Sequence, residues 1–356
     1  MGVTMGEQVI KRHSVITEDM ETLFSLGEDW QRFAGKHVVI AGSTGFLAAY
    51  LVEFFAWLSE RWPESPVYIH ALARHREKLE QRFPHLMGKH WFIPLIQDVC
   101  DPLPGLVRAD YIVHAASAGS PKYYLRDPVG TARANVVGTL NLLELAKRTG
   151  GRLLFMSSGA VYGNGDSKES IGETDFGTLD PLDPSACYGE GKRMGETLCA
   201  DYHRQYGVET VISRISHTYG PGVALDDGRS FADFVADALA GRDIVLNSDG
   251  TSSRPFCYVS DAAAAFLILL LRGEAGKAYN VGMDHEMTIF ELAELVASLS
   301  PHSGIQVRRP PPSPDRQAEF RSSGHFNLAR MEQLGWRPGI MPEVGFKRTL
   351  RYFIPS

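Results

Sequence analysis

The sequence predicts an α/β protein in which a doubly wound parallel sheet carries a smaller C-terminal α/β lobe. Short apolar runs typical of buried strands alternate with helical patterns of ten or more residues, and such helices cover a parallel sheet on both faces. The first of these strands leads through a glycine-containing turn into a long helix. The length of 356 residues exceeds that of a typical single domain, so we expect a second lobe beside the sheet.

The first half of the chain has the more regular pattern. It predicts strands at residues 37–41, 67–73, 91–97, 111–115, 153–157 and 209–213, and helices at 18–26, 46–62, 130–149 and 185–206. The second half predicts helices at 231–240, 261–272 and 288–300, a short strand at 243–246 and a proline-rich loop at 308–315. Thr288 and Glu291 have the spacing of a capping box at the start of the last helix.

Composition narrows the classes of partner. A formal net charge of -6 argues against nucleic acid as the main partner, because phosphate binding favours a basic surface. Four scattered cysteines without metal-ligand spacing indicate a reducing compartment, and we predict no metal site. The polar start of the chain and the lack of a long apolar run predict a cytoplasmic protein with no membrane contact.

The glycine-containing turn has the chemistry of a dinucleotide site. Its residues are Gly42-Ser43-Thr44-Gly45-Phe46-Leu47-Ala48, between a predicted strand and a predicted helix. Gly42 permits the tight turn, Gly45 lets backbone N–H groups approach a pyrophosphate, and Ala48 lets the helix lie close to the strand. The helix N-terminus then favours the anionic phosphates. We therefore predict cofactor contacts from Gly42, Thr44, Gly45, Phe46 and Leu47.

We predict that the chain has three parts. Residues 1–35 form an N-terminal arm, and residues 36–215 form a Rossmann dinucleotide-binding domain to which some later segments return. Residues 216–356 form mainly a substrate-binding lobe. The arm is expected to be structural or to contact another subunit.

The identity of the dinucleotide is less well defined by the residues. An acidic side chain at the end of the second strand would favour NAD, but Arg74 stands there. Arg74 could pair with the 2′-phosphate of NADP, stack on adenine, or lie exposed at a helix start. Asp98 and Val99, after the third strand, are positioned to contact the adenine. The residues alone leave NAD and NADP open.

A tyrosine and a lysine four residues apart form the candidate catalytic pair. Tyr188 and Lys192 share one face of a predicted helix, and a nearby cation favours the phenolate form of a tyrosine. Tyr188 could then take a proton from a sugar hydroxyl while a hydride moves to nicotinamide, and Lys192 could hold the nicotinamide ribose. Ser158, at the end of a predicted strand, could hydrogen-bond the reacting oxygen. Asn135 could complete the polar network, on the helix that follows the segment Ala115-Ala116-Ser117.

Taken together, these residues resemble a known family. The segments that carry the resemblance are Gly42-xx-Gly45-xx-Ala48, His114-Ala115-Ala116-Ser117, Ser157–Gly163, Tyr188-xxx-Lys192, Arg214-Ile215, Tyr219-Gly220-Pro221, Arg254–Asp261 and Tyr279–Gly282. They are similar to the extended short-chain dehydrogenase/reductases that act on nucleotide sugars. The resemblance implies a nucleotide-sugar substrate, a slight preference for NAD over NADP, cofactor contacts from Ala115, Ala116, Ser117 and Asn135, and a homodimer formed through residues 131–147 and 185–206.

Within that family several segments look most like UDP-glucuronate decarboxylases. These are Ser120-Pro121 with Tyr124 and Asp127-Pro128, Ala186–Arg193, and Asp227-Gly228-Arg229. The likeness implies that Ser158, Tyr188 and Lys192 carry the redox chemistry. It also implies that Arg229 and Arg254 bind the diphosphate and uridine side, and that Ser120 and Tyr124 lie near the sugar.

Three positions depart from that pattern. The decarboxylases and 4,6-dehydratases carry a glutamate where this chain has Ala160, and the dehydratases an aspartate at Gly159. Without these carboxyl groups water elimination lacks its acid and base, whereas a 4-epimerase needs only the Ser, Tyr and Lys. His217 stands where relatives carry an asparagine that contacts the diphosphate, and an imidazole could replace it.

The leading prediction is therefore an NAD(P)-dependent nucleotide-sugar epimerase that oxidises C4, lets the ketone rotate and reduces it again. A UDP-sugar or UDP-hexuronate is the expected substrate. A decarboxylase-like enzyme or a 4-ketosugar reductase is the alternative. A non-catalytic dinucleotide-binding scaffold is an alternative of another class.

Overall fold

The computed structural model of the chain describes residues 11–163, 170–310 and 325–354. Its centre is a seven-stranded sheet in which every neighbouring pair is parallel, in the order β11-β7-β5-β4-β1-β2-β3. The strands are β1 His37–Ala41, β2 Tyr68–Ala73, β3 Phe92–Ile96, β4 Tyr111–His114, β5 Arg152–Ser158, β7 Thr210–Ile215 and β11 Lys277–Val281. The strand order reverses between β1 and β4, the point at which open α/β sheets bind ligands. The predicted doubly wound parallel sheet is confirmed.

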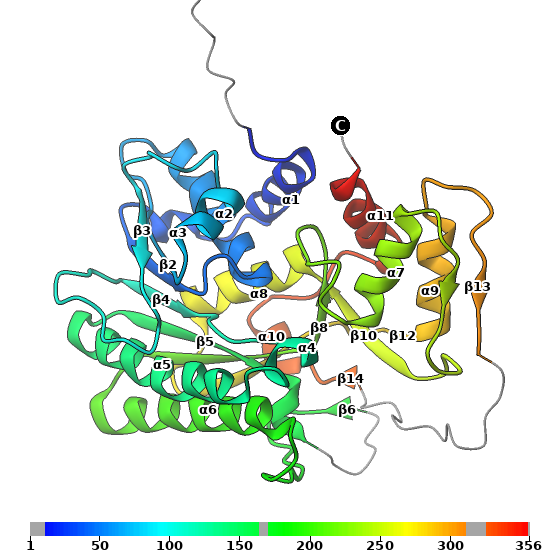
Figure 1. The fold of residues 1–356 in the computed structure, drawn as a ribbon. Helices are drawn as coiled ribbons and strands as arrows, with labels where there is room; N and C mark the ends of the chain where they lie inside the picture. Colours follow the sequence, from blue (N-terminus) through cyan, green and yellow to red (C-terminus); the bar gives the residue numbers. More distant parts are fainter. Residues whose placement is uncertain (1–10, 164–169, 311–324, 355–356) are drawn as a thin grey trace, which may run out of the picture.

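Helices cover both faces of this sheet (Figure 1). Helices α5 (Pro128–Thr149) and α6 (Ala186–Tyr206) lie on one face, and α2 (Phe46–Arg61) and α8 (Val259–Arg272) lie on the other. Alternate residues of β1 enter two different cores, since Val38 and Ile40 pack in one cluster and Val39 and Ala41 in the other. This period of two is what a strand buried on both faces requires.

A smaller lobe follows β7. It holds the sheet β12-β10-β8, formed by Glu286–Thr288, Ser253–Tyr258 and His217–Tyr219, with α7 (Ser230–Leu239) and α9 (Ile289–Ser298) packed together beside it. Two short parallel pairs join β9 (Ile244–Val245) to β13 (Val307–Arg308) and β6 (Ser170–Ile171) to β14 (His325–Phe326). The remaining elements are α1 Ser14–Ser25, α3 Arg76–Arg82, α4 Pro121–Tyr124, α10 Ala329–Gln333, α11 Pro342–Phe353 and two 3-10 turns at Trp30–Phe33 and Gly159–Tyr162.

The predicted strands and helices are present, with ends that shift by a few residues. Helix α1 begins at Ser14, four residues before the predicted start, because the His13 ring accepts a hydrogen bond from the Val15 amide and caps the helix. The predicted Thr288–Glu291 capping box is confirmed. Strands β8, β10, β11 and β12 and helix α11 were not predicted. Of the predicted loop at 308–315, Arg308 ends β13, and residues 311–315 lie outside the described part of the chain.

The N-terminal helix is joined to the rest of the chain by a buried carboxylate. Asp19 of α1 is fully buried and accepts hydrogen bonds from the hydroxyls of Tyr50 at 3.0 Å and Tyr258 at 2.8 Å. Arg348 of α11 donates to its other oxygen at 2.7 Å. Because these partners come from α2, the end of β10 and α11, Asp19 joins both ends of the chain to the core. The three-part division of the chain remains a prediction.

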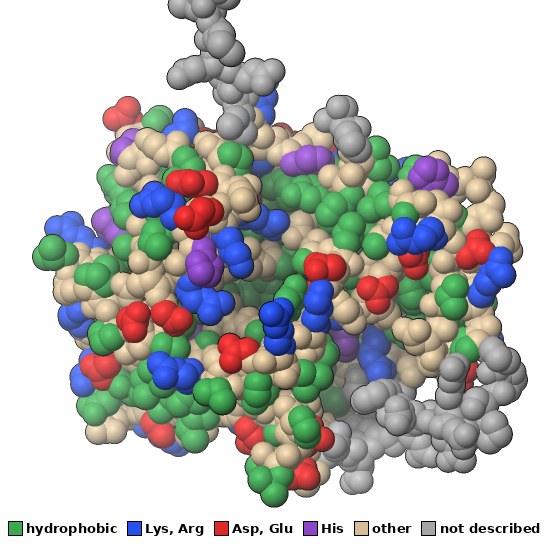
Figure 2. Space-filling model, viewed as in Figure 1, with side chains coloured by type: hydrophobic (Ala, Val, Ile, Leu, Met, Phe, Trp, Pro, Cys, Tyr) green, Lys and Arg blue, Asp and Glu red, His purple; other side chains and the backbone are tan. Residues whose placement is uncertain are grey.

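The surface carries both signs of charge. On the face shown in Figure 2, acidic and basic side chains are interspersed. Within residues 11–163, 170–310 and 325–354, no helix is long and apolar enough to cross a bilayer.

Candidate active site

The glycine turn after β1 has a shape that only glycine permits. Gly42 has a φ of 76°, in the left-handed region, and a methyl group there would lie 2.8 Å from the backbone of Ala116. The turn therefore lies directly against the segment after β4. Gly45 caps α2 without a side-chain hydrogen bond, which leaves the first-turn N–H groups of this helix available to phosphate. The structure thus brings together two of the predicted cofactor segments.

The predicted adenosine contacts lie at the ends of β2 and β3. Arg74 is exposed, and the Asp98 carboxylate accepts a hydrogen bond from the Cys100 amide at 2.8 Å. That backbone hydrogen bond, together with the charges of Arg74 and Arg133, lowers the pKa of Asp98. Asp98 is therefore a fixed anion at this end of the sheet, and Val99 beside it is buried.

Two buried polar atoms face the space between the glycine turn and α6. Within the described residues, neither Ser117 Oγ nor Asn135 Oδ1 has a hydrogen-bond partner. Asn135 donates to the Thr131 carbonyl, and its side chain lies against Gly191, the residue before Lys192. Buried polar groups are nearly always paired, so these two atoms fit a ligand that would bind there.

Tyr188 and Ser158 come together at the carboxyl end of β5. Ser158 accepts a hydrogen bond from the Ala160 amide at 3.2 Å, and its hydroxyl is close enough to Tyr188 to lower the pKa of the phenol. The ring of Tyr124 stacks on that of Tyr188, with centroids 5.4 Å apart and planes 10° apart. A methyl group at Gly119 would lie only 3.6 Å from the Tyr188 hydroxyl oxygen. The predicted catalytic hydroxyls are thus adjacent, beside the predicted sugar loop.

The expected electrostatic effect of Lys192 on Tyr188 is wrong for this structure. Burial raises the pKa of Tyr188, and the factors that lower it are the hydrogen bond with Ser158 and the charge of Arg229. Lys192 is itself 2% exposed, and burial lowers its pKa to about 7. Its ammonium donates to the Met156 carbonyl at 2.6 Å and lies 5.8 Å from the centre of the Tyr188 ring. Desolvation outweighs the spacing argument because both side chains lie inside the protein.

The predicted substrate residues of the lobe line one cavity. His217, Arg229 and Arg254 line a cavity of about 310 Å³, and Phe231 and Phe256 also belong to its lining. The Asp227 carboxylate holds Arg229 through an Nε–Oδ2 hydrogen bond of 2.7 Å. The surrounding protein and the two arginines lower the pKa of His217 to about 4, although its ring is reached by solvent within the cavity. A neutral imidazole therefore shares the cavity with two guanidinium groups.

The predicted sugar loop connects the large sheet to this lobe. The Ser120 hydroxyl, which is buried, donates to the Asp227 carbonyl. Lys122 forms an exposed ion pair of 2.8 Å with Asp226. Arg229 follows in the same lobe segment and its charge lowers the pKa of Tyr188, so we consider the predicted catalytic tyrosine together with the lobe cavity.

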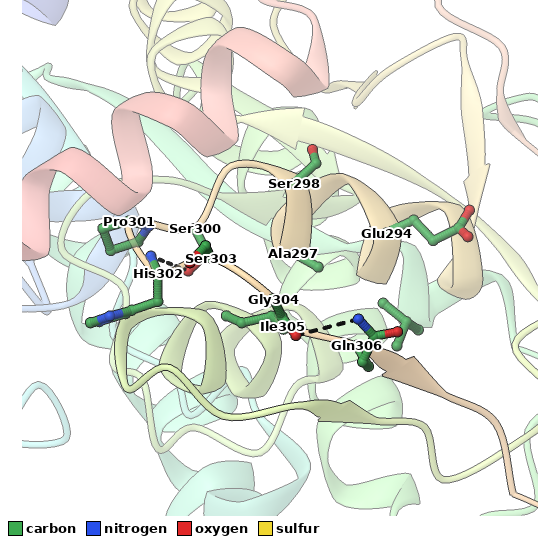
Figure 3. A pocket seen from close by; sticks show the side chains of 11 residues that line it. Glu294, Ala297, Ser298, Ser300, Pro301, His302, Ser303, Gly304, Ile305 and Gln306 are labelled. Carbon is green, nitrogen blue, oxygen red and sulfur yellow. Dashed lines mark hydrogen bonds between the residues drawn. The ribbon is translucent and has the colours of Figure 1, made fainter.

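A second cavity contains none of the predicted site residues. It is larger, about 680 Å³, and is lined by the end of α9 and the segment that leads into β13 (Figure 3). Its lining comes from residues 294–307 alone. We assign the site to the smaller cavity, because there side chains from several elements converge.

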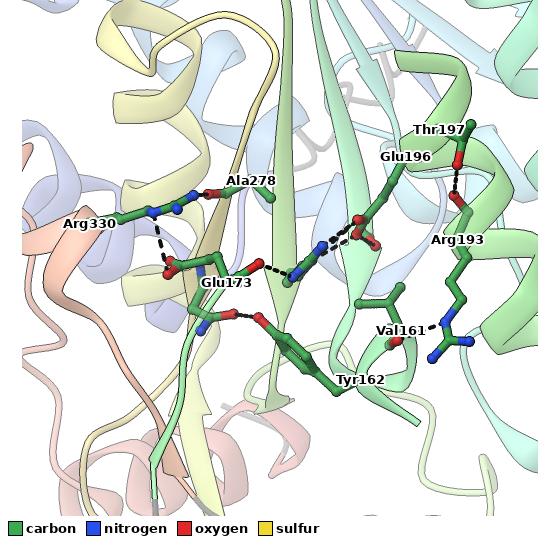
Figure 4. A network of polar contacts seen from close by, with 11 residues as sticks. Val161, Tyr162, Glu173, Arg193, Glu196, Thr197, Ala278 and Arg330 are labelled. Carbon is green, nitrogen blue, oxygen red and sulfur yellow. Dashed lines mark hydrogen bonds and ion pairs between the residues drawn. The ribbon is translucent and has the colours of Figure 1, made fainter. Parts of the chain in front are cut away.

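Sequence reasoning missed a buried ion pair behind the catalytic pair. Glu196 of α6 binds Arg214 of β7, with an Nη2–Oε2 distance of 2.7 Å (Figure 4). Glu196 follows Lys192 by four residues, as Lys192 follows Tyr188, so helical spacing could have revealed it. Phe326 was also missed: a methyl group at Gly159 would lie 2.7 Å from its ring. No local pattern predicts that contact, because Phe326 belongs to a strand far along the chain.

Comparison with known proteins identifies the family. Residues 38–282 match the NAD dependent epimerase/dehydratase family, which is more than half of the chain. The chain is 38% identical over 308 residues to UDP-glucuronic acid decarboxylase 3 of Arabidopsis thaliana, covering 86% of each protein. The chain belongs to the NAD dependent epimerase/dehydratase family. It is therefore a nucleotide-sugar enzyme of this class, as predicted, and the family description names the cofactor that the prediction favoured.

Solved structures of other epimerases and dehydratases have the same fold. UDP-glucose 4-epimerase of Thermotoga maritima superposes with a TM-score of 0.73 at 23% identity, over 89% of this chain and 98% of the other. The dTDP-glucose 4,6-dehydratase of Bacillus anthracis gives a TM-score of 0.71 at 19% identity, over 89% and 96%. At sequence identities this low, the comparison shows a shared fold and nothing further.

Proposed function

We propose that this enzyme binds NAD and a UDP-linked sugar and interconverts sugars that differ at C4. The observations that carry the proposal are the influence of Ser158 and Arg229 on the pKa of Tyr188 and the cavity that holds His217, Arg229 and Arg254. The hydroxyls of Ser158 and Tyr188 can transfer a proton, and the two arginines of the cavity supply positive charge for a diphosphate. The family match and the decarboxylase relatives make a nucleotide sugar the natural ligand of that cavity.

The residues present fit a bound dinucleotide. Gly42 lets the turn lie against the backbone of Ala116, where a side chain would clash, and the start of α2 presents free N–H groups. The unpaired Ser117 Oγ and Asn135 Oδ1 would gain partners from the cofactor. When bound, NAD accepts a hydride from a sugar carbinol carbon and returns it to the resulting ketone. Contacts from Thr44, Phe46 and Leu47 to the pyrophosphate, and from Arg74, Asp98, Val99 and Ala115 to the rest of the cofactor, belong to this proposal.

In this mechanism Tyr188 takes the proton of the sugar C4 hydroxyl as the carbon is oxidised. Ser158 hydrogen-bonds the same oxygen and holds it near the Tyr188 hydroxyl. Lys192 binds the cofactor ribose, and the charge of Arg229 favours the phenolate form of Tyr188. After the ketone has rotated, Tyr188 returns the proton to the oxygen on the other face. Arg229, Arg254 and His217 hold the nucleotide throughout, while Ser120 and Tyr124 border the sugar.

Epimerisation is favoured over dehydration by the residues after β5. Ala160 has no carboxyl group, and Gly159 cannot gain one without displacing Phe326, which lies 2.7 Å from the position of a first side-chain carbon. A dehydratase needs an acid and a base at these positions. Oxidation and re-reduction at C4 need neither.

Decarboxylation is the second candidate, because the relative reported above is a UDP-glucuronic acid decarboxylase. A 4-keto sugar with a carboxylate on C5 is a β-keto acid, which can lose carbon dioxide without a dedicated base. The first step, oxidation at C4, is the same for both candidates.

The test is product analysis by mass spectrometry and NMR after incubation with UDP-glucuronate and, separately, UDP-glucose. We expect a C4 epimer of unchanged mass. Loss of carbon dioxide would select the decarboxylase, and loss of water would contradict both candidates. Tyr188→Phe should lower kcat by about 10²-fold or more in every case. The matched control is Tyr123→Phe, since Tyr123 is 40% exposed.

We further propose that the enzyme is a homodimer formed through α5 and α6, as the family resemblance implies. The two helices pack side by side and leave apolar side chains on their outer surface: Val129 is 68% exposed, and Met194 and Tyr206 are each 46% exposed. Analytical ultracentrifugation should give twice the chain mass.

A further inference from the structure

Three consecutive residues of β5 meet three residues of α6 that lie on one face of the helix. Lys192 donates to the Met156 carbonyl at 2.6 Å, and the Ser157 hydroxyl donates to Glu196 at 2.6 Å. Ser158 is close enough to Tyr188 to lower the pKa of its phenol. The helical residues are four apart, so each faces the strand one turn from the next. Two of the three contacts belong to the proposed chemistry, and the contact of Glu196 has no assigned role.

Glu196 is the most strongly fixed member of this row. Arg214 Nε donates to its Oε1 at 3.0 Å, and Arg214 Nη2 donates to its Oε2 at 2.7 Å. The Arg214 side chain is 8% exposed and also donates to the Glu173 carbonyl at 2.9 Å, within the network of Figure 4. Bidentate contact between planar groups fixes orientation as well as distance. The pair therefore ties α6 to β7 at the level of Lys192.

We propose that Glu196, held by Arg214, is the positioning residue for Lys192 and keeps its ammonium group charged and in register with Tyr188. The proposal deepens the proposed function, on which it rests for the role of Lys192. Glu196 acts through geometry, because its carboxylate sets how α6 lies against β5. It also acts through charge, because the carboxylate lies inside the protein one helical turn from the ammonium.

The charges around Lys192 support this role. Burial lowers the pKa of Lys192, while Glu196 is the main group that raises it, with Cys199 contributing in the same direction. The other titratable groups that face it are Tyr188 on the same helix and His114 of β4. The pKa of His114 is lowered to about 3 by burial and by Lys192 itself, so this histidine is neutral. The negative charge of Glu196 therefore partly offsets the lowering of the Lys192 pKa by burial.

The test measures the titration of Lys192 directly. Protein labelled with ¹³C at lysine Cε is titrated by NMR, and the Lys192 signal is assigned as the one lost in Lys192→Met. Glu196→Gln keeps the shape but removes the negative charge, so the pKa of Lys192 should fall. Arg214→Met removes the neighbouring positive charge, so the pKa should rise. A purely structural role predicts no such opposite shifts.

Enzyme kinetics provide the second measurement. Glu196→Gln should lower kcat by about tenfold with little change in KM, and move the alkaline limb of the kcat profile to lower pH. Glu190→Gln is the matched control, because Glu190 is on the same helix and pairs with Arg193 at 3.4 Å near the surface. If Arg214→Met does not fold, Glu196→Gln against this control decides the question.

Unchanged titration of Lys192 in Glu196→Gln, or shifts of one sign in both variants, would overturn the proposal. The NMR titration needs neither sugar nor turnover. Failure to convert any nucleotide sugar would thus count against the proposed function, and an unmoved Lys192 pKa would count against this inference alone.

Discussion

At the residue scale, the sequence predicted which residues form the candidate site but not the shifted pKa values of Lys192 and Tyr188. Spacing along the chain identified Tyr188, Lys192 and Ser158, and the structure brings Ser158 to Tyr188. Spacing could not show that Lys192 is buried, because burial depends on α5, β4 and β5 packing around it. The same packing lowers its pKa to about 7 and leaves Arg229, from another part of the chain, as the charge that lowers the pKa of Tyr188.

The buried lysine should make stability depend on pH in a specific window. Its pKa is lowered from 10.5 to about 7, so between these values the unfolded chain binds a proton that the folded chain does not. Unfolding free energy should therefore rise with pH across this window because of Lys192. Lys192→Met should remove that part of the slope. Urea unfolding of both proteins at several pH values measures it, and equal slopes for the two would contradict the predicted pKa.

At the element scale, the alternating pattern predicted most of the large sheet, and long-range pairing explains what it missed. Strand β11 was not predicted because its neighbour β7 is more than sixty residues away, and only that pairing makes Lys277–Val281 a strand. Strands β8 and β12 have three residues each, and β10 pairs with both of them, so the register of the three depends on one another. Helix α1 was predicted as part of a structural arm, but not the contacts of Asp19, because its partners come from distant parts of the chain.

The contact of Asp19 predicts a large effect on stability. Asp19→Asn keeps the size of the side chain but leaves Arg348 and two tyrosine hydroxyls around a neutral amide, so unfolding free energy should fall by about 3 kcal/mol. Glu18→Gln is the control, since Glu18 pairs with Arg351 on the surface and should cost under about 1 kcal/mol. Equilibrium denaturation compares them. Similar losses for both would show that α1 contributes little to the fold.

At the scale of the whole molecule, the site is formed between the large sheet and the lobe. The hydroxyls proposed to be catalytic lie on β5 and α6, whereas the cations proposed to bind the nucleotide lie in the lobe. Ser120 and Lys122 connect the two through Asp227 and Asp226. Sequence could predict members of both sets, but the contact between them follows only from the fold.

This connection predicts an effect on substrate affinity rather than stability. Lys122→Ala removes an exposed ion pair between the two halves, so KM should rise by a factor below about five while Tm stays unchanged. Steady-state kinetics and thermal melting measure the two quantities. A large fall in Tm would mean that this contact holds the lobe in place.

The packing of Phe326 against Gly159 has a consequence for how this enzyme could change its chemistry. An aspartate introduced at 159 has no room unless the ring at 326 is first reduced in size. Each substitution alone is then a loss, by a clash in one order and by a void in the other. Laboratory evolution that accepts one substitution at a time should therefore meet a loss at its first step toward a carboxylate at 159.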